Sequence, residues 1–476
     1  MIELSQKIID YILDNFGEDY LAKYKEYISN DYIPYLRFGD LDIHPQKLID
    51  ELSCYNIQLE PIDNIPGSYK IVNGIENAGK TIEFTIGKYY IQSLSSMIPP
   101  LILNPQPLDK VLDCCAAPGS KTTQLAELMN NRGTLVANEP NISRLKALAH
   151  NVDKMTSVNI GISKLKGELI SKYLDGFFDK SLVDVPCSAL GILQKKGEVS
   201  NWWNKNQVEK ISSLQLKLLI SAIKTLKVGG EIVYSTCTLT LEENELVINK
   251  VLEKYPVELV EINLPVKSVE GFTKYKTSKL NPNLSKTRRI IPWEINSEGF
   301  FVAKLRKIGR TESLQKFKFP NRGLKLINFT NNKIRKYIEE LHHYFGIPLE
   351  VFKDFKYLIR NNNIFIVNKD WDYPLIDLLI RTGIPLGNID RKNLLRLHSH
   401  GAQILSTNIS SNIIEIDNGN DLRNYFSGSV FVRNDESDGQ KVIKYKDYVL
   451  GTAVVLQGKV KSQFPRSKRT HDIIIP

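Results

Sequence analysis

Apolar and polar residues alternate in two different rhythms along the first two thirds of the chain. Near the start, apolar residues recur every three to four positions and predict an amphipathic helix, at Ile8, Ile9, Ile12, Leu13 and Phe16. Further on, short apolar runs predict buried strands at 111–114, 134–137, 178–184 and 231–235. Periodic segments predict helices at 121–129, 142–152, 207–226 and 242–252. This alternation predicts an α/β fold with a mostly parallel sheet covered on both faces, whose ligand site lies beyond the carboxyl ends of the strands.

The pattern changes after residue 305. Short strand-like runs at 363–367, 429–432 and 448–450, separated by Gly and Asn, predict a separate β-rich module. The basic segment 304–322 is predicted to connect the two parts. The chain therefore divides into an N-terminal α/β accessory module, a central α/β domain, a linker with a small connecting module and a β-rich C-terminal module, at 1–75, 76–307, 308–385 and 386–476.

Composition narrows the class of protein. A chain of 476 residues with 42% hydrophobic residues can bury a large core. It has neither an apolar run of the roughly 20 residues that a bilayer requires nor a secretory signal at its start, so we expect a cytoplasmic protein. The five cysteines fit neither a disulfide framework nor zinc spacing, so we expect free thiols and no metal. The net charge of +10 favours a polyanionic partner, although a Lys- and Asn-rich proteome would produce the same charge.

A turn of small residues follows the first strand of the central domain. The strand ends at Asp113, and residues 114–122 read Cys-Cys-Ala-Ala-Pro-Gly-Ser-Lys-Thr before a helix. Small side chains let a ligand approach the backbone and the helix N-terminus. The dinucleotide motif has three glycines where this turn has one, which disfavours a nicotinamide enzyme. Glu139, after the next strand, could bind ribose hydroxyls, so the pattern favours a nucleoside cofactor without a pyrophosphate. A ligand-free turn and a solvated Glu139 are the alternatives.

Two cysteines lie just beyond predicted strand ends, Cys187 in the segment 184–188 and Cys237 in the segment 235–238. Both should reach the edge of the sheet that carries the small-residue turn. A single cysteine there would more often be a small buried residue, but a pair beside a nucleoside site suggests a nucleophile. A thiolate that adds to C6 of cytosine makes C5 able to attack a sulfonium methyl group. Asp184 is the candidate that hydrogen bonds to N3 and the exocyclic amine of the base.

The chain resembles the NOL/NOP/SUN family of RNA cytosine-C5 methyltransferases, and within it the bacterial ribosomal RNA enzymes. The resemblance is carried by residues 87–92, 95–97, 113–122, 184–188, 235–245, Arg289, Pro292, 299–303 and 458–466. It implies that residues 76–307 form a class I, Rossmann-like methyltransferase domain that uses S-adenosyl-L-methionine as cofactor. It also implies that the N-terminal module assists in binding RNA.

The resemblance implies roles for individual residues. Cys237 would attack C6 of the cytosine, and Cys187 would assist release of the product. Cofactor contacts would come from Cys115, Ala116, Ala117, Pro118, Gly119, Lys121, Glu139, Arg144 and Asp184. The chain has Lys166-Gly167 where relatives commonly carry an Asp before Gly, so the usual contact to the adenine end is in doubt. Asp175 and Asp179 remain open as substitutes.

The C-terminal module resembles a PUA-type RNA-binding domain. Its basic residues would then contact phosphates, at Lys459, Lys461, Arg466, Lys468 and Arg469. A solvated basic tail is the alternative reading. Aromatic residues could either stack on bases or pack in a core, at Tyr425, Phe426 and Phe464 in this module and at Trp202 and Trp203 in the central domain.

Together these features predict a monomeric enzyme that methylates cytosine C5 in RNA, with 16S ribosomal RNA or the small ribosomal subunit as its leading substrate. The target base would have to be flipped out or exposed during assembly, because a paired cytosine does not present C6 to a thiolate. A transfer-RNA methyltransferase and a non-catalytic RNA-binding assembly factor are the alternatives. An amino-methyltransferase fits less well, because the loop at residue 184 reads Asp-Val-Pro-Cys.

Overall fold

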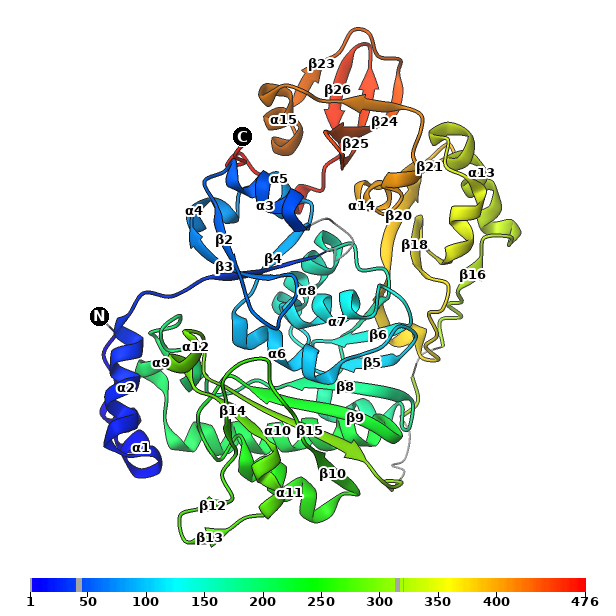
Figure 1. Cartoon of the computed structure of the whole chain (residues 1–476). Coiled ribbons are helices and arrows are strands. Elements are labelled where there is room, and N and C mark those ends of the chain that lie inside the picture. The colour runs from blue at the N-terminus through cyan, green and yellow to red at the C-terminus, as the bar shows by residue number, and fades with distance from the viewer. Residues whose placement is uncertain (1, 40–44, 313–316, 320) are drawn as a thin grey trace.

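The computed structural model describes residues 2–39, 45–312, 317–319 and 321–476 (Figure 1). Its centre is a ten-stranded sheet with five parallel strands in the middle. In spatial order these are β9 (Leu226–Thr236), β8 (Phe178–Asp184), β5 (Lys110–Asp113), β6 (Thr134–Asn138) and β7 (Ile160–Ser163). The main helices between them in the chain are α7 (Ser120–Leu128), α8 (Ile142–Lys154) and α10 (Lys205–Thr225), and α11 (Glu245–Lys254) follows β9. The predicted α/β core is therefore confirmed, with β7 as a strand that the sequence pattern did not single out.

Antiparallel strands extend this sheet at both edges. Next to β9 lie β15 (Phe300–Lys307), β14 (Arg288–Ile290) and β11 (Val269–Glu270), and β10 (Val257–Val260) also pairs with β15. At the other edge, β19 (Leu379–Thr382) pairs with β7, so a segment from the far part of the chain completes the sheet. Smaller elements near the first edge are β12 (Lys274–Tyr275), β13 (Ser278–Lys279), α9 (Val199–Trp202) and α12 (Pro292–Ile295).

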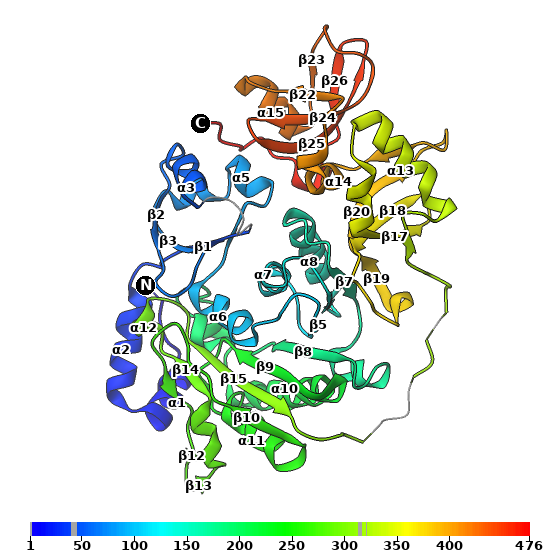
Figure 2. The same ribbon diagram turned by 45° about the vertical axis from the view of Figure 1, so that its right-hand side comes forward.

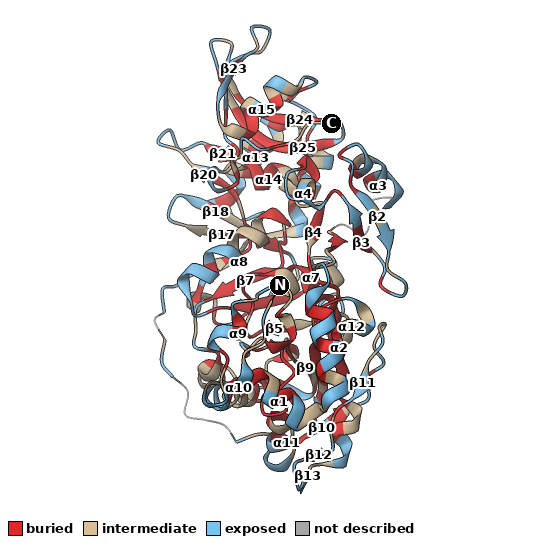
Figure 3. Ribbon diagram, turned by 90° about the vertical axis from the view of Figure 1, so that its left-hand side faces the viewer, coloured by how far each residue is buried: buried red, intermediate tan, exposed pale blue. Residues whose placement is uncertain are grey.

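Helices cover both faces of the sheet, and the strands between them are buried (Figure 3). On one face, Leu219 of α10 and Val247 of α11 pack in the cluster that contains Tyr234. On the other, α6 (Leu94–Leu103) and α7 supply Met97 and Leu125. Each such side chain contributes roughly 1.5–3 kcal/mol relative to an exposed position. This packing holds the sheet between two layers of helices. Polar side chains therefore gather at the amino and carboxyl ends of its strands.

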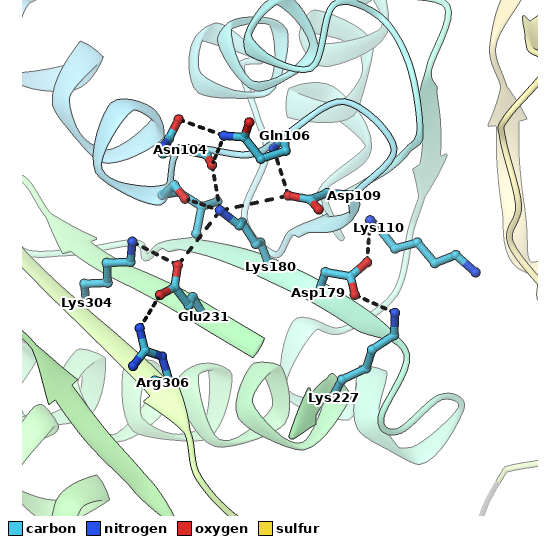
Figure 4. A network of polar contacts seen from close by, with 11 residues as sticks. Asn104, Gln106, Asp109, Lys110, Asp179, Lys180, Lys227, Glu231, Lys304 and Arg306 are labelled. Carbon is cyan, nitrogen blue, oxygen red and sulfur yellow. Dashed lines mark hydrogen bonds and ion pairs between the residues drawn. The ribbon is translucent and has the colours of Figure 1, made fainter. Parts of the chain in front are cut away.

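A polar network closes the amino end of the central sheet (Figure 4). The Nζ atom of Lys180 donates to the carbonyl of Asn104 at 2.6 Å, and Glu231 accepts from Lys304 at 2.9 Å and from Arg306 at 3.1 Å. Asp179 accepts from the backbone N–H of Lys110 at 2.9 Å. These side chains bond to one another, so the network stabilises this end of the sheet. The candidate site lies at the opposite, carboxyl end.

The N-terminal part has two structural pieces. Helices α1 (Gln6–Phe16) and α2 (Glu18–Ser29) form the predicted helical start and pack on the central domain through Tyr24 and Trp203. The second piece is a four-stranded sheet in the order β2 (Gln58–Pro61), β3 (Ser68–Asn73), β1 (Tyr35–Phe38) and β4 (Tyr89–Ile91). Its helices are α3 (Pro45–Ser53), α4 (Ile75–Ala78) and α5 (Ile82–Thr85). Strand β4 belongs to this sheet although it lies beyond residue 75, where the sequence pattern places the module boundary.

The region beyond residue 322 is rich in strands, as predicted. One sheet contains β16 (Ile327–Asn328), β17 (Phe355–Arg360), β18 (Asn363–Asn368), β20 (Ile384–Ile389) and β21 (Leu395–Leu397). The other contains β22 (Ile413–Glu415), β24 (Gly439–Tyr445), β25 (Tyr448–Leu456), β26 (Lys459–Ser462) and β23 (Val430–Val432). The accompanying helices are α13 (Asn332–Phe345), α14 (Ser399–Ile404) and α15 (Gly419–Ser427). Part of the connector predicted at 304–322 lies outside the described residues.

The N-terminal and C-terminal modules share a hydrophobic core. Ile82 and Ile86 of the first module are buried with Phe426 and Phe464 of the last. The backbone N–H of Ile474 also donates to the carbonyl of Lys80 at 3.0 Å. Figure 2 shows these modules side by side above the central domain. Among the described residues, no helix has the length and apolar character to cross a membrane.

Candidate active site

The small-residue turn lies at the carboxyl end of β5, where α7 begins at Ser120. It lines a small polar cavity together with neighbouring groups, at Asp113, Cys115, Ala116, Ala117, Pro118, Ser120, Lys121 and Asp184. Gly119 has φ of 111°, a left-handed conformation that favours glycine. The structure thus brings the residues of the predicted cofactor turn together around one cavity.

Asp113 is buried at the base of this cavity. Burial raises the pKa of its carboxyl to about 7, although the hydroxyl of Thr122 donates to Oδ2 at 2.7 Å and opposes the shift. The other oxygen, Oδ1, has no hydrogen-bond partner among the described residues. A buried acceptor without a partner is costly, so this atom is well placed to accept from a cationic ligand group.

Glu139 and Arg144 lie beside the same turn. Glu139 is buried and accepts from the backbone N–H of Asn141 at 2.8 Å. Arg144 lies 3.4 Å from the Glu139 carboxylate and donates to the carbonyl of Ala117 at 2.6 Å. Arg144 therefore links the carboxylate after β6 to the turn after β5, as expected of two residues at one ligand site.

Asn138 is a positioning residue to which the sequence pattern gave no role. Its amide donates to the carbonyls of Cys114 at 3.2 Å and Leu165 at 3.0 Å. Its oxygen accepts from Ser163 Oγ at 2.7 Å and from the backbone N–H of Leu165 at 2.9 Å. One buried side chain thus ties together the ends of β5, β6 and β7. The sequence signal that could have identified Asn138 is its position as the polar last residue of an apolar strand.

The departure at Lys166 leaves no carboxylate at that position. Lys166 is exposed and precedes a short 3-10 helix, Gly167–Lys172. Asp179 cannot replace the missing group, because it lies at the amino end of β8 and pairs with Lys227 there (Figure 4). Asp175 precedes that same end of the strand.

Asp184 is held between two partners. Lys121 Nζ lies 2.8 Å from its Oδ2 atom, and Ser235 Oγ donates to its Oδ1 atom at 2.8 Å. Burial alone would lower the pKa of Lys121, but the Asp184 carboxylate raises it, so the lysine stays charged. The Lys121 ammonium also interacts electrostatically with Cys237.

The two predicted cysteines meet at this rim. Cys187 Sγ and Cys237 Sγ are 3.0 Å apart, and both thiols are free and half-buried. The hydrogen bond to Cys237 and burial raise the pKa of the Cys187 thiol well above its usual value, with Glu243 adding to the effect. Cys187 therefore keeps its proton and can donate it to the Sγ atom of Cys237.

Glu243 organises both cysteine loops, a role that the sequence did not reveal. Its carboxylate accepts from the N–H of Ser188 at 2.8 Å, from Thr240 Oγ1 at 2.7 Å and from the amide of Gln215 at 2.9 Å. Gln215 also donates to the carbonyl of Pro186 at 2.9 Å. The sequence places Glu243 among other acidic residues before a helix, where an exposed position would be the ordinary expectation.

The aromatic residues and one basic residue, Lys468, of the C-terminal module depart from the predicted RNA contacts. Tyr425, Phe426 and Phe464 are core residues, so base stacking is wrong for them. Lys468 is 8% exposed, and Arg469 donates to the carbonyl of Phe464 at 3.2 Å. Lys468 is held within the protein because this segment packs on the rest of the chain, whereas Arg469 is half-buried and its phosphate contact stays a prediction. Of the five basic residues predicted to contact phosphates, three are exposed, at Lys459, Lys461 and Arg466. In the central domain Trp203 is buried and Trp202 is 39% exposed.

Comparisons with known proteins agree with this geometry. Residues 100–306 match the family described as 16S rRNA methyltransferase RsmB/F. The chain is 31% identical to ribosomal RNA small subunit methyltransferase F of Shewanella piezotolerans, over 94% of this chain and 93% of that protein. It is 37% identical to the tRNA (cytosine(49)-C(5))-methyltransferase of Pyrococcus abyssi, over 55% of this chain and 84% of that protein.

A solved structure, a methyltransferase homologue from Pyrococcus horikoshii, superposes with a TM-score of 0.58 at 30% identity, covering 64% of this chain and 96% of that one. The chain spans 37–47% of the length of the ribosomal RNA cytosine-C5 methyltransferases from nematode, mouse and human that it matches. The near full-length match to methyltransferase F establishes the relationship. The chain belongs to the RsmB/F family of NOL/NOP/SUN RNA cytosine-C5 methyltransferases.

Proposed function

We propose that this chain transfers the methyl group of S-adenosyl-L-methionine to C5 of a cytosine in RNA, and that its substrate is 16S ribosomal RNA. The observation that carries the proposal is the pair of thiols, 3.0 Å apart, at the same rim as the cofactor turn. An RNA-binding protein without catalytic activity would need neither thiol.

The residues at the turn fit the cofactor. The unpartnered Oδ1 atom of Asp113 is suited to the ammonium group of the methionine part, and Glu139 is suited to ribose hydroxyls. Backbone groups from Cys115 to Gly119 are open to close approach because their side chains are small. The remaining contacts are assigned to Lys121, Arg144 and Asp184. When bound, the cofactor supplies an electrophilic methyl group on a sulfonium.

The first half of the reaction belongs to Cys237. Its thiolate adds to C6 of the cytosine, forming a carbon–sulfur bond and moving an electron pair toward C5. C5 would then take the methyl group that the cofactor supplies, while the methyl–sulfur bond breaks and its electron pair stays on the sulfur. The Lys121 ammonium lies close enough to interact electrostatically with Cys237. Asp184, fixed by Lys121 and Ser235, accepts a hydrogen bond from the exocyclic amine and so orients the base.

The second half belongs to Cys187. Once Cys237 is bound to carbon, its sulfur is a thioether, so the hydrogen bond to Cys237, which is the largest cause of the raised pKa of Cys187, is weakened. Cys187 then loses its proton to solvent, and its thiolate removes the proton from C5. The electron pair of that C–H bond restores the ring double bond, and the S–C6 bond breaks. Cys237 leaves as a thiolate, and the pair returns to its starting state.

The flanking modules are proposed to select the RNA. The exposed cations of the PUA-like segment 386–476, at Lys459, Lys461 and Arg466, are suited to phosphates. The match to methyltransferase F includes these modules, whereas the match to the transfer-RNA enzyme covers 55% of the chain. This difference favours 16S ribosomal RNA over transfer RNA.

Transfer of labelled methyl groups from S-adenosyl-L-methionine to ribosomal RNA, small subunits and transfer RNA tests the proposal. We expect 5-methylcytosine at defined sites in 16S RNA. Cys237→Ala should abolish it, and Cys187→Ala should accumulate a covalent protein–RNA adduct. Cys54→Ala is the matched control, because that cysteine is exposed and outside the site. If the wild type binds these RNAs but methylates none, a role as an assembly factor replaces the proposal.

A further inference from the structure

Three side chains from separate segments meet near the Lys121 ammonium, with which one of them, Glu298, interacts electrostatically. Lys195 Nζ lies 3.4 Å from Glu298 Oε1 and 5.5 Å from the centre of the Tyr32 ring. Glu298 is held from behind by Ser93 Oγ, which donates to its Oε2 atom at 2.7 Å. The Lys195 side chain is 49% exposed, whereas that of Glu298 is 9% exposed. The cluster therefore presents its cation, and not its carboxylate, to solvent.

The loop that carries Lys195 is tied directly to the nucleophile. The backbone N–H of Gly191 donates to the carbonyl of Cys237 at 3.0 Å, and Gly299 donates to the carbonyl of Gly191 at 2.9 Å. A Cβ atom at Gly191 would lie 2.3 Å from the Gly299 oxygen, so only glycine permits this packing. The Lys121 ammonium interacts with both Cys237 and Glu298, which places the cluster beside the reacting groups.

The exposed ammonium of Lys195 is the part of this cluster that suits an anionic ligand. Asp113, Asp184 and Glu298 surround the site, and the buried Lys121 is already paired with Asp184. Contact between Lys195 and Glu298 at 3.4 Å is looser than the 2.8 Å pair formed by Lys121, and a half-exposed ion pair is weak. A more strongly binding anion can therefore displace Glu298 as the partner of Lys195.

We propose that Lys195 binds a backbone phosphate of the RNA beside the target cytosine, and that Glu298 holds the lysine in place until that phosphate replaces it. The phosphate that carries a base lies within a few ångströms of it, so a contact here would set the distance between the base and Cys237. Tyr32 provides a face against which the lysine stem or an adjacent base can rest. The inference rests on the proposed function only in taking RNA as the ligand.

Salt-dependent binding of a labelled 16S ribosomal RNA fragment tests the proposal, with wild type, Lys195→Ala, Lys195→Arg and the matched control Lys196→Ala. Lys196 is the next residue, has the same charge and is also exposed. Loss of one phosphate contact should weaken binding about tenfold and lower the slope of log affinity against log salt by about 1. Lys195→Arg should retain most of the affinity, and Lys196→Ala should change it less than about threefold.

Two outcomes overturn the inference: unchanged affinity and slope in Lys195→Ala, or equal losses in Lys195→Ala and Lys196→Ala. Glu298→Gln supplies an independent check, because removal of the competing carboxylate should strengthen RNA binding. Weaker binding in Glu298→Gln would contradict the exchange of partners. Methyl transfer by the wild type is scored separately. If the wild type transfers methyl groups but Lys195→Ala leaves RNA binding unchanged, only this inference is refuted. If RNA binding depends on Lys195 but the wild type transfers no methyl group, only the proposed reaction is refuted.

Discussion

Two buried, charged regions of this protein differ in how their charges are compensated. At the catalytic rim, Asp184 lies between Lys121 and Ser235, and Glu243 accepts from several donors. The second region, here called the junction, packs α8 against the C-terminal part of the chain. It consists of His150, Asp153, Lys154, Arg381, His398, His400 and Lys468.

At the junction, Asp153 is the acidic member, and Arg381 pairs with it at 2.7 Å. Lys468 Nζ and both ring nitrogens of His400 have no hydrogen-bond partner in the described part of the chain. Burial lowers the pKa of Lys468 to about 7, whereas Asp184 raises the pKa of the equally enclosed Lys121. The charged partner, and not the degree of burial, therefore decides whether the pKa of a buried lysine is raised or lowered.

Removal of Glu243 should have the largest effect, because the rim depends on partners. Glu243→Ala leaves the donors of Ser188, Thr240 and Gln215 without an acceptor in a buried site. We expect a loss of roughly 3–5 kcal/mol in the free energy of unfolding. Methyl transfer should fall about a hundredfold, since Cys187 loses its support. Urea denaturation and single-turnover assays measure the two effects. The control is Glu253→Ala, on the exposed side of α11, which should leave both the free energy of unfolding and methyl transfer nearly unchanged. Equal losses in the two variants would contradict the role assigned to Glu243.

At the junction, the same kind of change should have the opposite sign. Lys468→Met removes a buried ammonium that has no hydrogen-bond partner among the described residues and keeps an apolar stem, so we expect stabilisation of roughly 2–4 kcal/mol at pH 7. The unfolded chain holds this proton more tightly than the folded protein. The penalty is therefore complete below pH 7 and disappears as the pH rises from about 7 toward 10.5. Denaturation of both proteins across that range measures it. Exposed Lys461→Met should be neutral, and a destabilised Lys468→Met would show that the ammonium has a compensating partner.

The contrast also marks what a sequence can predict. The strand and helix pattern placed Cys187 and Cys237 at one sheet edge, because the carboxyl ends of parallel strands coincide. It could not place β19, whose pairing with β7 joins residues far apart in the chain. The sequence could not predict the burial of Lys468 for the same reason, because its neighbours lie on α8 and near α14, far away in the chain. Glu243 escaped because a glutamate before a helix is usually solvated.

The junction histidines predict a smaller effect at acidic pH. Burial lowers the pKa of His398 to about 4, so the unfolded state binds the proton first as the pH falls. The wild type should lose about 2 kcal/mol of stability between pH 6.5 and 4 through this group, and His398→Asn should not. Asparagine can still accept from the backbone N–H of His400, as His398 does at 3.3 Å, and so keeps the helix cap. Parallel pH profiles for the two proteins would refute the assignment.

The smallest effect should come from the exposed ion pair that links the N-terminal and C-terminal modules. Lys47 and Asp447 lie 2.5 Å apart, but their side chains are 46% and 77% exposed. Solvent screens such a pair, and ordering two mobile side chains offsets most of the attraction. Lys47→Ala should therefore change the free energy of unfolding by less than about 0.5 kcal/mol. A double-mutant cycle with Asp447→Ala, at low and high salt, measures the pair. A coupling near that of the buried rim would mean that exposure is a poor guide to the strength of charge pairs in this protein.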